Sequence, residues 1–169
     1  VQARLVGAQL SALQALGRTT AAALELLEQL AQRTPTLRED PTLVLDWCQH
    51  VEPDAASAWL QRLRDRARQR GASAIERSLG VRQVQCLLKR HPRRARALAL
   101  ELLPMLDAGL HVNLCPAQAW ALLAAALKGS QGRTCRARAL QWLQQVRLPE
   151  PAQDWQPAYA VWQAGLLGP

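Results

Sequence analysis

Apolar residues recur along the chain at helical spacing, and one heptapeptide pattern occurs four times. "LELLEQL" begins at Leu24, "LQRLRDR" at Leu60, "LELLPML" at Leu100 and "LQWLQQV" at Leu140, at intervals of 36, 40 and 40 residues. Leucines at the first and fourth places of each copy lie one helical turn apart and form an apolar stripe. Alanine-rich residues precede each copy and allow another helix to approach closely. The pattern predicts the second helix of a repeated helical hairpin.

Capping and turn residues between the apolar stretches set the predicted helix boundaries. Helix starts are expected at Asp40–Pro41, Asp54, Pro116 and Thr134, helix ends at Gly71 and Gly129, and a break at His91–Pro92. These are the residue types that begin and end helices in proteins. The predicted hairpins pair 2–16 with 20–33, 41–51 with 55–70, 74–90 with 92–108, and 116–128 with 135–147. A last helix covers 155–165.

The predicted fold is all-α: a right-handed helical-hairpin solenoid of about nine helices in four and a half repeats of about 36–40 residues. The approximate repeats are 1–37, 38–71, 72–110, 111–150 and a partial copy at 151–169. Residues 1–169 form a single helical-repeat domain, and the start at Val1 suggests a segment of a larger protein. The composition agrees, because Ala, Leu, Gln and Arg are abundant whereas Val, Ile and Thr are sparse. An irregular helical bundle is the alternative.

The fourth hairpin resembles the tetratricopeptide repeat. The matching residues of its two helices are Trp120, Leu123, Ala124 and Leu127, then Ala139 and Leu143, with Pro151 afterwards. The first hairpin is similar through Val6, Gly7, Leu10, Ala23, Leu27 and Pro35. Hairpins two and three match poorly, and "GSQGRTCRA" adds residues between the helices of the fourth, so a HEAT- or armadillo-like solenoid is the closest rival. The resemblance implies a protein–protein scaffold with a concave face.

The same resemblance allows one family function to be tested. Chaperone-binding members hold a carboxylate with Lys and Asn on the inner face of the first helix of a repeat. The corresponding face of the fourth hairpin carries Gln118, Ala121, Ala125 and Lys128. Alanines do not clamp a carboxylate, so a shallow apolar groove is expected here instead.

The net charge of +8 is concentrated in residues 59–96, where twelve basic residues face only Asp65 and Glu76. Arg62, Arg66 and Arg70 share one face of a predicted helix, and Arg64 and Arg68 lie roughly opposite. "KRHPRRAR" at 89–96 occupies a turn between two helices. The candidate binding residues are Arg62, Arg66, Arg70, Lys89, Arg90, Arg93, Arg94 and Arg96. A solvated arginine face, a docking edge for an acidic protein segment, and a nucleic-acid backbone site are the three interpretations.

The motifs of common catalytic sites are absent. The chain has no glycine-rich phosphate loop and no CxxC pair, and His50, His91 and His111 stand far apart. Asp46 and His50 form an i, i+4 helical pair, while Glu25 and Glu101 recur at one repeat position, which indicates structural roles. We therefore expect no enzyme, no cofactor and no metal site.

The sequence thus predicts a non-catalytic protein–protein interaction scaffold or adaptor. Its partner would be another protein, with an acidic or amphipathic segment bound at the groove or the basic residues. The alternative is a nucleic-acid-associated domain, and a third interpretation is self-association through the C-terminal helix, which carries Trp155 and Trp162. The remaining tryptophans singled out, Trp59 and Trp142, are expected to fill space between helices.

Four scattered cysteines, expected to be reduced, indicate an intracellular protein in the cytoplasm or nucleus. The longest apolar stretch, residues 119–127, is too short to span a membrane.

Overall fold

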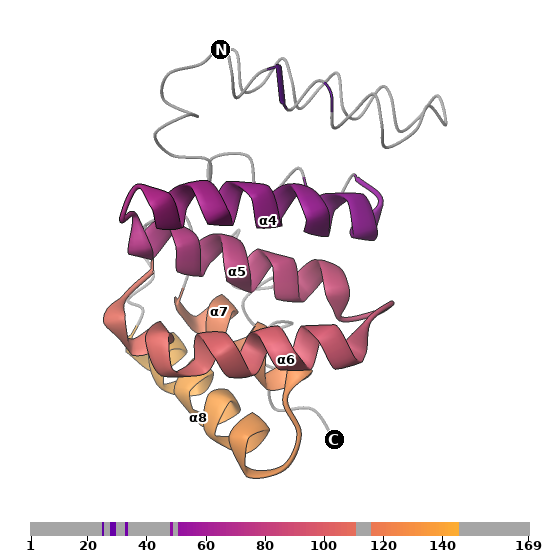
Figure 1. The fold of residues 1–169 in the computed structure, drawn as a ribbon. Coiled ribbons are helices and arrows are strands. Elements are labelled where there is room, and N and C mark those ends of the chain that lie inside the picture. Colours follow the sequence, from indigo (N-terminus) through magenta and orange to yellow (C-terminus); the bar gives the residue numbers. More distant parts are fainter. Residues whose placement is uncertain are drawn as a thin grey trace, which may run out of the picture.

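The computed structural model describes residues 51–110 and 116–145, together with Glu25, Glu28, Gln29, Arg33 and Cys48. This part of the chain is all-α and contains no strand. Its elements are α4 (Pro53–Gln69), α5 (Ser73–Leu87), α6 (Pro92–Leu102), the 3-10 helix η2 (Leu103–Ala108), α7 (Pro116–Ala126) and α8 (Gly129–Gln145) (Figure 1). None of the described helices combines the length and the apolarity needed to cross a bilayer.

Several of the helices predicted from the sequence lie wholly or partly outside the residues that the structure describes. The helices predicted at 2–16 and 155–165, and with them Trp155 and Trp162, lie outside the described residues. The four described residues of the predicted helix 20–33 are all helical. Cys48 and Val51, from the predicted helix 41–51, lie in a 3-10 turn and a bend, so the α-helical prediction is wrong at these two positions.

Helix α4 begins two residues earlier than predicted, because Glu52 and not Asp54 is its N-cap. The Glu52 carboxylate accepts hydrogen bonds from the backbone N–H groups of Asp54 (2.9 Å) and Ala55 (3.2 Å). Pro53 occupies the first helical position, where its missing N–H costs nothing. The end of α4 follows the prediction: Gly71 adopts φ +69°, a left-handed conformation that glycine reaches without steric penalty.

Proline determines both boundaries of α6. The predicted break at His91–Pro92 is confirmed, since α5 ends at Leu87 and α6 begins at Pro92. The predicted continuation of this helix to residue 108 is wrong from residue 103 onwards. Pro104 has no N–H for the α-helical ladder, and the chain tightens into η2. Arg77 of α5 donates hydrogen bonds to the carbonyl oxygens of Gly109 (2.7 Å) and Ala108 (3.1 Å) at the end of η2.

The turn between α7 and α8 is shorter than predicted. Gly129 adopts φ +68° and the helix begins at once, so Thr134 lies inside α8 and does not cap it. The residues "GSQGRTCRA" that depart from the tetratricopeptide pattern therefore belong to α8. A Cβ atom at Gly132 would lie 2.5 Å from the Leu127 carbonyl oxygen, so only glycine permits this close approach of helix and turn.

Helix α5 lies at the centre of the described structure. It packs against α4 on one side and against α6 and α7 on the other, and α7 packs against α8 (Figure 1). One apolar core joins α5 to α8, with Val84, Leu102 and Leu123 fully buried. A second core, which includes Trp59 and Leu60, lies around α4 and the start of α5.

The repeated heptapeptide is buried unevenly. Leu60 and Leu63 are buried as the apolar stripe predicts, and Leu143 is buried in α8. In α6 the predicted apolar stripe is wrong. Ala95, Ala99 and Leu102 face the core there, and Leu100 is 38% exposed. The prediction for the tryptophans holds for Trp59 but is wrong for Trp142, which is 40% exposed on α8.

We expect Gly132→Ala to destabilise the protein. Alanine normally favours a helix over glycine by up to about 1 kcal/mol, but its Cβ would lie 2.5 Å from a backbone oxygen that cannot rotate away. The net loss should be about 1–3 kcal/mol, measured as the free energy of unfolding in urea. Ser130→Ala, an exposed position of the same helix, is the control and should change stability by less than about 0.5 kcal/mol. A stabilised Gly132→Ala variant would contradict the close approach.

Candidate binding surface

The candidate basic residues lie in two separate places. Arg62, Arg66 and Arg70 follow α4 towards its C-terminal end, whereas Lys89, Arg90, Arg93, Arg94 and Arg96 surround the α5–α6 turn. Figure 1 shows these two regions at opposite ends of the helices. The α5–α6 turn meets the start of α4, and the 17 residues of α4 span about 26 Å. Arg70 and the turn therefore do not form one continuous edge.

The α4 arginines differ in their surroundings. Arg62, whose side chain is 53% exposed, forms an ion pair with Glu28. Arg66 is exposed and has no carboxylate within ion-pair distance among the described residues. Arg70 is exposed at the end of the helix, beside Gly71. On this face of α4, the charge of Arg62 is therefore already balanced.

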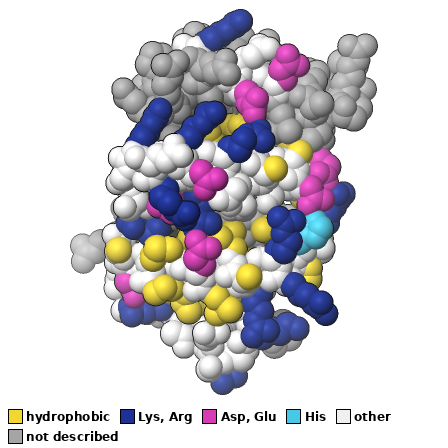
Figure 2. Space-filling model, viewed as in Figure 1, with side chains coloured by type: hydrophobic (Ala, Val, Ile, Leu, Met, Phe, Trp, Pro, Cys, Tyr) yellow, Lys and Arg dark blue, Asp and Glu magenta, His cyan; other side chains and the backbone are white. Residues whose placement is uncertain are grey.

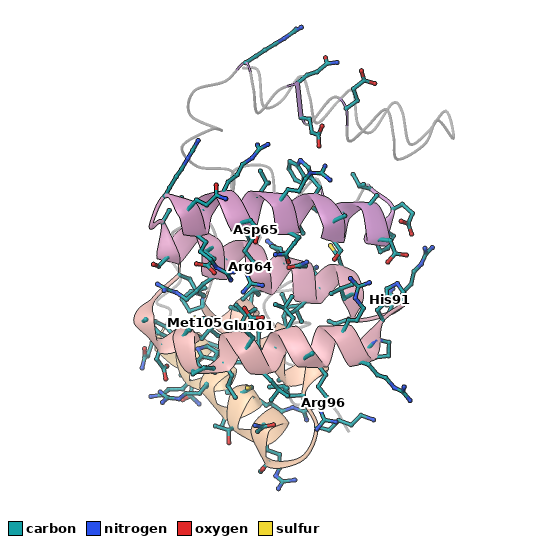
Figure 3. All side chains as sticks on the ribbon, in the orientation of Figure 1. Arg64, Asp65, His91, Arg96, Glu101 and Met105 are labelled. Atoms are coloured by element: carbon teal, nitrogen blue, oxygen red, sulfur yellow. The ribbon has the colours of Figure 1, made fainter. Side chains whose placement is uncertain are left out.

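Arg64 and Arg68 lie on the opposite face of α4, as the helical spacing predicted, and belong to an internal ion network. The Arg64 side chain is only 3% exposed and forms an ion pair with Glu101 of α6, while its Nε lies 3.9 Å from Glu76 of α5. Arg68 lies 2.8 Å from Glu76 and 3.7 Å from Glu101. The hydrogen bond to Glu76 raises the pKa of Arg68. Figure 3 shows Arg64 and Glu101 approaching each other from their two helices.

A glycine of α5 makes room for Leu102 of α6 beside this network. A Cβ at Gly80 would lie 3.4 Å from Arg64 Nε and 2.8 Å from Leu102 Cδ2, and Leu102 is fully buried. The guanidinium group of Arg64 therefore passes close to the α5 backbone on its way to α6. The recurrence of Glu25 and Glu101 in the sequence indicated a structural role, and the ion pair confirms this role for Glu101.

Two residues of the α5–α6 turn are tied to the start of α4. Arg90 forms an ion pair with Glu52, the N-cap of α4, and lies 4.0 Å from Asp54. His91 Nε2 lies 2.6 Å from the Asp54 carboxylate. The two acidic residues at the α4 N-terminus are also favoured by the helix dipole. Arg90, one of the predicted binding residues, thus has a structural partner.

Of the five candidate basic residues around the α5–α6 turn, four remain after Arg90 is set aside. These are Lys89, Arg93, Arg94 and Arg96, and we call them the basic edge. All four are exposed, and none has a carboxylate within ion-pair distance in the described part of the chain. Arg93 and Arg94 occupy the first turn of α6, which holds no acidic residue. Positive charge at a helix N-terminus opposes the helix dipole. Figure 2 shows basic groups gathered below the histidine with no acidic group among them.

The predicted groove residues lie along one flank of α7 and the turn that follows it. Gln118 and Ala121 are partly buried, whereas Ala125 and Lys128 are exposed. Lys128 lies beyond the end of α7, in the turn to α8. The flank offers a small apolar strip with one charge at its end, and nothing in it would clamp a carboxylate from two sides.

Sequence reasoning overlooked the surface of α8. Residues 116–145 contain Lys128, Arg133, Arg136 and Arg138 but no acidic residue, a signal that was present in the sequence. Arg138 lies 3.8 Å from Asp107 of η2 and 6.0 Å from the ring centre of Trp120. Arg133 and Arg136 are exposed.

The described cysteines are thiols: Cys48 and Cys135 are buried, and Cys86 is partly buried. Burial raises the pKa of Cys86 to about 11, with nearby Arg82 acting in the opposite direction. Burial also raises the pKa of Cys135. Such thiols stay protonated at neutral pH and are poor nucleophiles. No group of three or more metal-binding side chains occurs among the described residues, and Asp46, His50, His111 and Cys115 lie outside them.

Comparison with known proteins adds no family: no protein-family model, curated protein or solved structure matches this chain.

The Arg64–Glu101 pair predicts strong energetic coupling. Glu101→Gln leaves a buried guanidinium without its main partner, and we expect a loss of about 1–3 kcal/mol in the free energy of unfolding. Arg64→Met replaces the charge by an apolar chain of similar length. The double variant Arg64→Met/Glu101→Gln should therefore be at least as stable as Glu101→Gln alone. Urea denaturation of the four proteins measures the coupling, and strictly additive losses would refute it.

The raised pKa of Cys86 predicts slow alkylation and a defined pH window for stability. At pH 8, iodoacetamide should modify Cys86 far more slowly in the folded than in the unfolded protein, as read by peptide mass spectrometry. The folded thiol keeps its proton up to about pH 11, whereas the unfolded thiol loses it near 9. This contribution to stability is therefore complete below pH 9 and is lost as the pH rises to about 11. Cys86→Ala should show a shallower decline over this range, and an identical decline would refute the assignment.

Proposed function

We propose that the chain is part of a helical-repeat domain that acts as a non-catalytic adaptor. Its partner would be a protein with an acidic segment, held at the basic edge. The proposal extends the described all-α structure to a tetratricopeptide-like solenoid of stacked hairpins. Adaptors of this kind present an extended surface of rigid helices to a partner.

The order of packing supports the repeat. Helix α5 contacts α6 and α7, α6 also contacts α7, and α7 contacts α8, so each hairpin packs against its neighbour in the sequence. In the predicted hairpins, α5 and α7 are first helices and α6 and α8 are second helices, although α5 packs more extensively against α4 than against α6. No single hairpin here buries its apolar face alone, as the shared core of α5 to α8 illustrates.

The proposal is based on the difference between basic residues that have a carboxylate partner and those of the basic edge, which have none in the described part of the chain. Arg62, Arg64, Arg68, Arg90 and Arg138 each have a carboxylate partner. The basic edge has none in the described part of the chain, and it places two arginines against the dipole of α6. A surface of uniform sign attracts an oppositely charged partner and increases its association rate. A bound acidic segment would remove the repulsion that the free protein retains.

A nucleic-acid backbone is the second candidate, because phosphates would satisfy the same four residues. Binding of single strands usually adds aromatic side chains on which bases stack. Trp59, which lies nearest in sequence to the basic run, is buried and offers no stacking surface. This favours an acidic protein segment over nucleic acid. An intracellular location is part of the proposal, and the scattered spacing of the four cysteines in the sequence favours it.

The test is a fluorescence-anisotropy titration of the 1–169 chain at 50 and 200 mM salt. The probes are a labelled 15-residue glutamate-rich peptide and a labelled 15-nucleotide single-stranded DNA. We expect the peptide to bind more tightly, and the variant Arg93→Glu/Arg94→Glu/Arg96→Glu to weaken that binding by about tenfold or more, because three attractions become repulsions. Tighter binding of the DNA with a steep salt dependence would favour the second candidate.

The matched control is Arg66→Glu/Arg133→Glu/Arg136→Glu, which alters the net charge equally. These three arginines are exposed and have no ion-pair partner in the described structure, yet they lie outside the basic edge. The control should bind the peptide within about threefold of the unaltered protein. Equal losses in the two triple variants would mean that net charge alone attracts the probe, which refutes a localised site.

A further inference from the structure

The exposed face of α6 is divided into a basic half and an apolar half. Arg93, Arg96, Ala97 and Leu100 are all exposed and lie at helical spacing i, i+3, i+4 and i+7, so they form one continuous strip. We call these four residues the outer strip. Its N-terminal half belongs to the basic edge, and its C-terminal half ends in Leu100. The same helix therefore offers charge and an apolar contact side by side.

Leu100 is exposed where the repeat pattern predicts a buried residue. The corresponding Leu60 of α4 is fully buried, whereas Leu100 is 38% exposed. Within the described part of the chain, Leu100 and Trp142 are the only large hydrophobic side chains that are well exposed to solvent. A single exposed leucine needs no explanation by itself. Its position on the same strip as two arginines without carboxylate partners distinguishes it.

Two acidic residues follow the outer strip in the sequence, and each lies within ion-pair distance of an arginine. Glu101 is held by Arg64 and Arg68, and Asp107 lies 3.8 Å from Arg138. Figure 3 shows Arg96 extending away from the side of α6 on which Glu101 meets Arg64. An acidic partner lying along the outer strip would therefore meet arginines and Leu100, and the nearby carboxylates already interact with other arginines.

From this arrangement we infer that the outer strip binds an acidic amphipathic helix of a partner protein, with Leu100 as its apolar contact. The inference rests on the proposed adaptor function and specifies the partner's chemistry. Leu100 lies four residues from Arg96 and seven from Arg93, or about 6 and 10 Å along α6. The partner helix would carry a large apolar residue one to two turns from its acidic residues. Helices that bind in this way present anchors at i, i+3, i+4 and i+7.

The test uses two labelled 18-residue helix-forming peptides at 150 mM salt. One carries three glutamates with leucines one and two turns away, and the other has serine in place of each leucine. We expect the unaltered 1–169 chain to bind the leucine peptide about tenfold more tightly, because only this peptide buries apolar surface against Leu100. Leu100→Ser should remove most of this difference and leave the affinity for the serine peptide unchanged.

Trp142→Ser on α8 is the matched control, since Trp142 is exposed to a similar extent as Leu100. It should preserve the preference for the leucine peptide. Leu100 and Trp142 are both surface positions, and the circular dichroism and urea midpoints of the two variants verify that they fold. An equal loss of preference in both variants indicates non-specific apolar adsorption and overturns the inference.

The outcomes separate this inference from the adaptor proposal. Equal affinity of the two peptides, with both weakened by Arg93→Glu/Arg94→Glu/Arg96→Glu, overturns the role of Leu100 but leaves the charge-based adaptor function standing. Absence of binding by both peptides and by the glutamate-rich peptide overturns both. A preference for leucine that depends on Leu100 and on the three arginines supports the acidic amphipathic partner.

Discussion

The packing of α4, α5 and α6 depends on the buried cation Arg64. A guanidinium group taken out of water is tolerated only when carboxylates and hydrogen bonds compensate it. Glu101 of α6 pairs with Arg64 Nη2, and Glu76 of α5 lies 3.9 Å from Arg64 Nε, which has no hydrogen-bond partner of its own in the described structure. Three helices are thereby held at one axial position relative to each other, because sliding any of them would separate the buried guanidinium from its carboxylates.

A second polar contact specifies the pairing of α4 and α5. Gln83 is buried in α5, and its amide donates to the Ser57 carbonyl oxygen (3.2 Å) and to Gln61 Oε1 (3.1 Å) of α4. Leucine and alanine pack almost equally well at many registers, whereas the Gln83 amide N–H groups meet their acceptors on α4 at only one. In a chain so rich in leucine and alanine, buried polar residues supply the specificity that the apolar residues lack.

The same ion network decides which arginines remain available to a partner. Carboxylates are scarce in this chain, with 13 acidic against 21 basic residues. Those of α4, α5, α6 and η2 that contact arginines are engaged between or within helices, and the α5–α6 turn retains Lys89, Arg93, Arg94 and Arg96. Internal ion pairing and unpaired surface charge therefore both follow from how the acidic and basic residues are distributed along the chain. The proposed binding face is a part of the basic segment whose residues have no carboxylate partner in the described structure.

The sequence by itself determined the helical class, the positions of most turns and the opposite faces of α4, because proline, glycine and residue spacing act locally. Helix ends at Gly71 and His91–Pro92 followed from backbone geometry alone. Only the tertiary structure decided that Arg64 is internal, that Leu100 is outside and that the basic residues separate into two regions. Each of these outcomes depends on which helix lies opposite the residue. The sequence of α5 does not indicate its neighbours, because this helix is buried on nearly every side and so lacks a one-sided apolar pattern. Contacts between residues 37 positions apart, such as Arg64 and Glu101, leave no periodic signal in a single sequence.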